Sequence, residues 1–146
     1  DAYWNASRHD WYNLMLSRRV APDALYLKAP RPMEDYEYLA SQGMAQFGIL
    51  DVNNIDSDAE PRSHTGLEAG NAAEPCRVNY TEEYVQRLVD ILRPTVTILE
   101  ERNLLHKAYI YGFDEQPRSC EPQIRRLFGA AKRAFPGLRT AATLNW

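Results

Sequence analysis

The stretch KAYIYGF, residues 107–113, followed at once by Asp114 and Glu115, decides how this chain is interpreted. Its aromatic and β-branched residues favour a strand. Residues 46–52 (QFGILDV) form a short apolar run bounded by glycine and asparagine, which predicts a second, buried strand. Residues 138–144 (LRTAATL) predict a third. Asp114 and Glu115 therefore stand at the end of a predicted strand, and the chain has one predicted strand before it and one after it.

Helical patterns separate these strands. Apolar residues recur at helical spacing in residues 7–19, in a segment from about Met33 to the stop at Gly43, and in residues 81–102 and 122–135. The third of these helices has a threonine cap and acidic residues in its first turn, and Pro94 is expected to kink or split it. Residues 24–27 are a candidate for one more short strand.

Strands that alternate with helices predict an α/β fold with parallel pairing through right-handed crossovers. An open doubly wound sheet and part of a (β/α)8 TIM barrel both fit. No glycine-rich phosphate loop follows a strand, which disfavours a nucleotide-binding sheet. A full barrel needs roughly 250 residues and eight strands. We therefore expect residues 1–146 to be about half of a barrel, a piece of a longer protein, since the chain opens on Asp1 and closes on Trp146 after an apolar stretch.

Composition excludes several classes of protein. The chain has 146 residues, is 45% hydrophobic and carries a formal net charge of −3, which fits one globular domain and argues against nucleic acid as a partner. Its apolar runs are too short for a membrane span.

Cys76 and Cys120 fit either a disulfide or two buried thiols. Two Asn-x-Ser/Thr sequons, at Asn5 and Asn79, lean slightly towards a secreted protein, and nothing else indicates a compartment. The polar stretch 53–79 is a long loop, and its His64 is expected to be an ordinary loop residue.

Two adjacent carboxylates at a strand end have a chemical use. One is kept protonated by apolar, aromatic surroundings and acts as a general acid. Its neighbour stays ionised and stabilises positive charge on the substrate. The other interpretation is structural: Asp114 caps the next helix and Glu115 faces water. Strict alternation places Asp114 on the face of Ala108 and Gly112, and turns Tyr111 with Phe113 towards the helices. Both acids reach one pocket only if the strand ends or bulges at Phe113.

The tyrosine-rich strand ending in Asp114-Glu115, together with the following helix and the entry Pro136-Gly-Leu-Arg-Thr140, resembles the catalytic domain of glycoside hydrolase family 123. The likeness covers roughly residues 104–143. It is looser over the N-terminal helix with Trp11 and the run 19–23. This resemblance implies a (β/α)8 barrel that removes terminal β-linked N-acetylgalactosamine without a metal or organic cofactor.

The same resemblance assigns roles to the acidic pair. Glu115 matches the general acid/base, and Asp114 matches the carboxylate that orients the 2-acetamido group of the substrate. In such substrate-assisted catalysis the acetamido oxygen attacks the anomeric carbon, so the enzyme needs no second nucleophile. A retaining β-N-acetylgalactosaminidase is thus implied. The alternative is a non-catalytic carbohydrate-binding or structural barrel of the same family.

Four further residues are candidates for substrate contacts. Asn145 and Trp146 end the next predicted strand, where an amide can bind a hydroxyl and an indole can stack on a sugar ring. The Tyr111 hydroxyl and Asn53 are the other two; core packing for Tyr111 and a turn for Asn53 and Asn54 are the competing interpretations. A glycan is the expected partner of the chain. Its open sheet edges are expected to pair with the rest of the barrel or with a second copy.

Overall fold

The computed structural model describes residues 2–55, 76 and 78–145. Helices and short strands alternate along most of its length, as the periodicity predicts. The helices and the strands of the main sheet are α1 (Ala2–Ser17), α2 (Met33–Ser41), β1 (Phe47–Asp51), α3 (Glu82–Glu101), β2 (Ala108–Tyr111), α4 (Glu121–Ala134) and β4 (Arg139–Ala141). The minor elements are the 3-10 turns Leu105–Lys107 and Arg118–Cys120 and the two short strands β3 (Gln116–Pro117) and β5 (Leu144–Asn145).

The main sheet has three parallel strands in the order β1-β2-β4, with Phe47 opposite Ala108 and Tyr109 opposite Arg139. The expected mixed α/β class with parallel pairing is therefore correct. The third predicted strand is shorter than expected, because pairing with β2 stops at Ala141 and the chain then forms β5 against β3.

Residues 24–27 lie beside β1 without forming a regular strand. The backbone N–H of Asp51 donates to the Leu27 carbonyl at 2.7 Å. The N–H of Gly48 donates instead to the Asp23 carboxylate, at 2.8 Å. A side chain thus replaces a backbone carbonyl at one end of this pairing, which explains why the expected strand does not appear as one.

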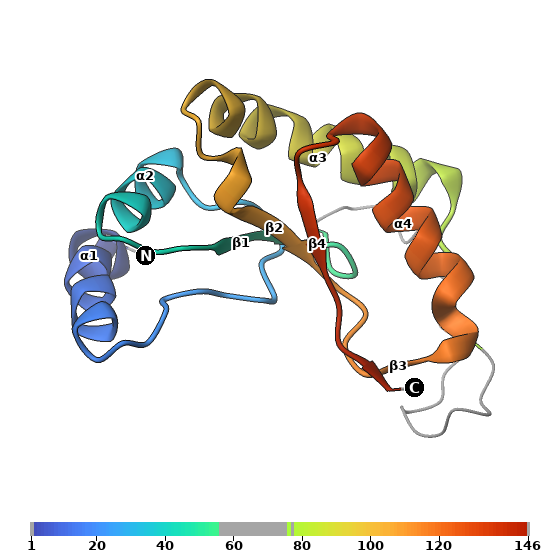
Figure 1. Ribbon diagram of the computed structural model, residues 1–146, viewed down its shortest axis with the longest axis horizontal. Coiled ribbons are helices and arrows are strands. Elements are labelled where there is room, and N and C mark those ends of the chain that lie inside the picture. Colours follow the sequence, from blue (N-terminus) through green and yellow to red (C-terminus); the bar gives the residue numbers. More distant parts are fainter. Residues whose placement is uncertain (1, 56–75, 77, 146) are drawn as a thin grey trace.

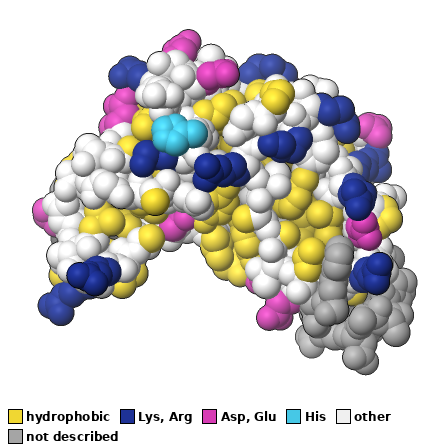
Figure 2. Space-filling model, in the orientation of Figure 1, with side chains coloured by type: hydrophobic (Ala, Val, Ile, Leu, Met, Phe, Trp, Pro, Cys, Tyr) yellow, Lys and Arg dark blue, Asp and Glu magenta, His cyan; other side chains and the backbone are white. Residues whose placement is uncertain are grey.

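Helices α2, α3 and α4 follow one another around one side of the sheet (Figure 1). The opposite side carries no helix within the described residues, and the molecule is hollowed there, with hydrophobic side chains gathered along the hollow (Figure 2). The core fills the space between the sheet and the helices. Its fully buried side chains include Ile110 of β2, Leu88 and Leu92 of α3, and Leu127 of α4. Because the three strands are parallel, the C-terminal ends of β1, β2 and β4 lie at a common edge of the sheet.

Helix α3 runs without a break from Glu82 to Glu101 and contains Pro94. The expected split at Pro94 is therefore wrong. Buried residues on both sides of the proline, Leu92 and Val96, anchor the two halves to the same core. Tertiary packing of the apolar face thus outweighs the hydrogen bond that proline removes. None of the helices that the structure describes is long and apolar enough to cross a membrane.

The start of α3 depends on a side-chain cap. The Thr81 hydroxyl accepts a hydrogen bond from the backbone N–H of Tyr84 at 3.2 Å. Replacing Thr81 with Ala leaves that N–H without this acceptor and is expected to lower the free energy of unfolding by about 1 kcal/mol. Chemical denaturation measures the change. Thr81→Ser keeps a hydroxyl and should stay close to the wild type; an equal loss in both variants would rule out the cap as the cause.

Cys76 and Cys120 form a disulfide. Of the two alternatives that the sequence leaves open, the structure shows the bridged one. Cys120 is buried and directly precedes α4, so the bond ties the segment before α3 to the start of α4. His64 and most of the polar loop lie outside the described residues.

Candidate active site

The chain makes a tight turn where β2 ends. Tyr111 is the last residue of the strand, and the backbone φ angles of Phe113 and Glu115 are +60° and +49°. Residues other than glycine rarely adopt positive φ, and such strained positions cluster at functional sites. The two strained residues flank Asp114. The strand thus ends before Phe113, which meets the condition stated above for both acids to reach one pocket, and the turn sets the direction of the Asp114 side chain.

Asn53, at the end of β1, holds this turn in place. Its side-chain oxygen accepts a hydrogen bond from the backbone N–H of Phe113, and its nitrogen donates to the Tyr80 hydroxyl. Gly112 is required for the close approach, because a Cβ there would lie 2.7 Å from the Asn53 oxygen and 2.5 Å from a Val52 methyl carbon. The contacts of the Asn53 carboxamide described here are internal, so Asn53 positions the turn.

The Asp114 carboxylate is held by the hydroxyl groups of two tyrosines from different segments. Tyr26 donates to one oxygen at 2.6 Å, and Tyr111 donates to the other at 2.8 Å. The Tyr111 hydroxyl also lies 3.1 Å from the Thr143 hydroxyl, just beyond β4. The rings of Tyr26 and Tyr111 meet edge to face with centroids 5.8 Å apart. Although Asp114 is exposed, its carboxylate is fixed in direction.

These hydroxyl groups favour the charged form of the acid. The hydrogen bond from Tyr26, followed by that from Tyr111, lowers the pKa of Asp114 below its ordinary value. The same hydrogen bond raises the pKa of Tyr26 to about 12, because ionising the phenol would place two negative charges side by side. Asp114 is thus a stable carboxylate at neutral pH, and Tyr26 is a stable hydrogen-bond donor.

The strand faces are the reverse of those expected from alternation. Ala108 and Ile110 belong to the fully buried core, whereas the hydroxyls of Tyr109 and Tyr111 contact Asp23 and Asp114. The prediction that Tyr111 packs towards the helices is therefore wrong. The reason is the turn: positive φ at Phe113 breaks the alternation, so that Phe113 packs on Phe128 while Asp114 returns to the face of Tyr111.

The structure places the remaining predicted site residues as follows. Glu115 is exposed, next to Asp114 in the turn, and makes no hydrogen bond or ion pair within the described part of the chain. Two of the aromatic residues expected around the general acid are used elsewhere, since Phe113 lies in the core and the Tyr109 hydroxyl contacts Asp23. Asn145 belongs to β5 by its backbone. Its side chain, and Trp146 altogether, lie outside the described residues.

Asp114 does not cap the next helix. Helix α4 begins at Glu121, and its N-cap position is Cys120. The structural alternative for Asp114 is therefore wrong, because six residues, three of them in a 3-10 turn, separate it from the helix that it was expected to cap. The alternative for Glu115, a side chain facing water, is what the structure shows.

Tyr26 and Thr143 are site residues that sequence reasoning missed. Tyr26 lies 88 residues before Asp114, in a segment with no motif of its own. The one available signal was the candidate strand at residues 24–27, because a strand parallel to its neighbours ends at the same edge of the sheet. Thr143 follows β4 in the same way that Asp114 follows β2.

Replacing Tyr26 with Phe tests this arrangement. Removing the hydroxyl takes away the donor that lowers the pKa of Asp114 most, so that pKa should rise towards its ordinary value. The pH below which Asp114 becomes protonated then moves upward. An NMR titration of the carboxyl carbon measures the shift. Tyr38→Phe removes a hydroxyl that contacts Asn13 instead, and it should leave Asp114 unchanged. Equal titration curves in all three proteins would contradict the arrangement.

Comparison of the chain with protein-family models, with curated proteins and with solved structures found no match. The described residues contain no group of three or more His, Cys, Asp or Glu side chains that is placed to hold a metal ion. The functional interpretation therefore depends on the acidic turn and the groups around it.

Proposed function

We propose that this chain carries part of the catalytic site of a retaining glycoside hydrolase that acts on terminal N-acetylhexosamine, with β-N-acetylgalactosaminides as substrates. Glu115 is the general acid/base and Asp114 orients the 2-acetamido group. The fold proposed with it is about half of a (β/α)8 barrel. Two features of the fold support the barrel: the three parallel strands follow chain order without a reversal, and the helices α2, α3 and α4 lie on one side of them (Figure 1).

The observation that carries the proposal is the fixed, ionised carboxylate of Asp114. Each of its oxygens accepts one phenolic hydrogen bond, and a carboxylate oxygen has a second lone pair. An acetamido N–H that approaches from the exposed side can therefore donate to it. The negative charge also stabilises the positive charge that the acetamido group acquires when its oxygen attacks the anomeric carbon.

Glu115 supplies the proton transfers of the proposed mechanism. Its protonated carboxyl gives a proton to the glycosidic oxygen as the bond from that oxygen to the anomeric carbon breaks and the bond from the acetamido oxygen forms. Water then attacks the anomeric carbon, the carboxylate takes a proton from it, and the acetamido group is restored. Adjacent positions in one tight turn suit this division, because the two reacting groups are neighbours on one sugar ring.

The substrate itself provides the test. The full-length protein is assayed with 4-nitrophenyl N-acetyl-β-galactosaminide and with the matched 4-nitrophenyl β-galactoside, which has a hydroxyl in place of the acetamido group. Because that group is the nucleophile, the galactoside should react at least ~10²-fold more slowly. Similar rates for both, or no turnover of the acetamido substrate, would overturn the proposal.

A second candidate function, carbohydrate binding without turnover, is favoured by one observation. The Glu115 side chain is exposed, so it is not enclosed in a pocket as a general acid commonly is. Two tyrosines at the strand edge suit sugar binding by themselves. In this case the full-length protein would bind N-acetylgalactosamine in a calorimetric titration and release no nitrophenol from the aryl substrate.

A further inference from the structure

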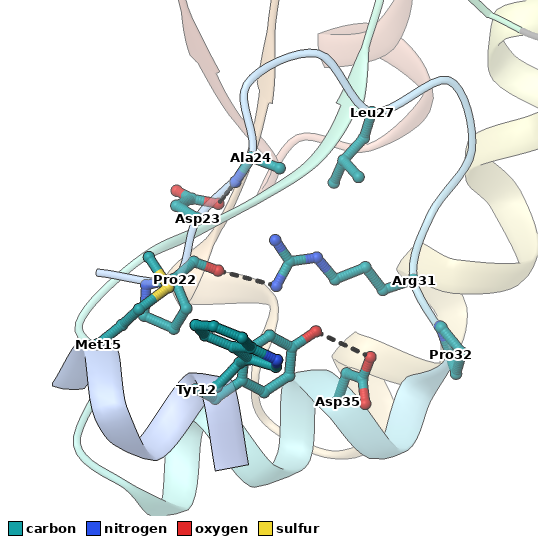
Figure 3. Close-up of a pocket in the computed structure, with 10 residues that line it drawn as sticks. Tyr12, Met15, Pro22, Asp23, Ala24, Leu27, Arg31, Pro32 and Asp35 are labelled. Carbon is teal, nitrogen blue, oxygen red and sulfur yellow. Dashed lines mark hydrogen bonds between the residues drawn. The ribbon is translucent and has the colours of Figure 1, made fainter. Parts of the chain in front are cut away.

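A cavity of about 380 Å³ lies between helix α1, the segment that follows it and the start of α2 (Figure 3). Its apolar wall includes Met15 of α1, Pro22 and Leu27 of the connecting segment, and Pro32 before α2. No residue of the Asp114 turn lines it. This volume lies in the range of small-molecule sites, which are mostly apolar and contain a few convergent polar groups. The cavity is thus a separate site from the one described above.

Arg31 provides the convergent polar group. Its guanidinium reaches into the middle of the cavity, opposite Pro22 (Figure 3). One terminal nitrogen donates to the Pro22 carbonyl at 2.9 Å, and the guanidinium carbon lies 5.6 Å from the centre of the Tyr12 ring. A guanidinium has five N–H donors, and no other acceptor for them is found among the described residues. Arg31 is therefore fixed in place by two contacts and still has donors for a ligand.

The two acids in the wall are already occupied. Asp35 is buried and accepts hydrogen bonds from Arg8 at 2.6 Å and from the Tyr12 hydroxyl at 3.2 Å. Asp23 accepts from two backbone N–H groups, at 2.8 and 2.9 Å, and from the Tyr109 hydroxyl at 2.5 Å. Both carboxylates serve the fold, so they do not compete for the remaining donors of Arg31. The N–H donors left for a ligand in this part of the wall are those of Arg31.

We propose that this cavity binds a small carboxylate with an apolar body. The carboxylate accepts the free N–H groups of Arg31, whose planar fork matches two oxygens at once. The apolar body lies against Met15 and Leu27 and displaces water from the wall. Tyr12 beneath the guanidinium keeps it aligned for the ligand.

Binding of 3-phenylpropanoate to the full-length protein, measured by isothermal titration calorimetry, tests the proposal. Saturable binding is expected, and 3-phenylpropanamide, which has the same body without the charge, should bind at least tenfold more weakly. Arg31→Gln should weaken binding of the carboxylate at least tenfold. Arg18→Gln changes an exposed arginine that does not line the cavity, and it should bind like the wild type.

Arg31 also ties down Pro22, so its replacement could disturb the segment itself. Leu27→Trp fills the cavity while leaving Arg31 in place, and it should abolish binding in the same way. Inorganic phosphate should compete poorly, because it lacks the apolar body. The proposal is overturned if the wild type shows no saturable binding, if the amide binds as well as the acid, if phosphate displaces the acid at equal concentration, or if neither variant weakens binding.

Discussion

Replacing Glu115 with Gln is expected to lower kcat for 4-nitrophenyl N-acetyl-β-galactosaminide by at least ~10²-fold in the full-length protein. The amide keeps the size and the polar contacts of the side chain but cannot release or take up a proton. The turn that carries it should persist, because the backbone is held by Asn53 and the Asp114 carboxylate by its hydroxyl donors. Binding of substrate should change much less than turnover.

The control for this variant is Glu101→Gln, which makes the same chemical change in an exposed side chain at the end of α3. It should retain the activity of the wild type. Asp114→Asn should also reduce kcat, since a neutral amide cannot steady the positive charge of the acetamido group. Unchanged turnover in Glu115→Gln removes Glu115 from the role of general acid and leaves sugar binding as the function of the turn.

Loss of the disulfide should have the largest effect on stability. Cys76 and Cys120 are 44 residues apart, and a bridge that closes a loop of this length restricts the unfolded chain by about 4 kcal/mol in the loop-entropy account. Replacing Cys120 with Ala should lower the free energy of unfolding by about that amount. Denaturant titration of the oxidised protein and of the variant measures the difference.

Three matched measurements separate the bridge from the packing of Cys120. Cys76→Ala, the double variant and the wild type in reducing agent all remove the same bond. They should all lose about the same free energy, and the reducing agent should have no further effect on the variants. A wild type that unfolds at the same denaturant concentration with and without reducing agent would show that the bond contributes nothing to stability.

Helical periodicity and capping predicted α2, α3 and α4 to within a residue or two, because these signals are local. The strands β1 and β2 followed from short apolar runs, and the acidic pair followed from its place after β2. Alternation holds along β2, but extending it through the positive-φ turn at Phe113 assigned Tyr111 to the wrong face. The expected split at Pro94 considered only the backbone hydrogen bond that proline removes. Packing of the helix on both sides of the proline keeps α3 continuous.

The sequence by itself determined the α/β class, the parallel order of elements and the position of Asp114 and Glu115 at a strand end. Tertiary structure alone decided that Tyr26 fixes Asp114, that Asn53 braces the turn and that the cysteines are bonded. Spacing of side chains along the chain encodes helices and strands, so it can be read locally. Contacts between residues 44 to 88 positions apart depend on how the layers pack, and no local pattern records that.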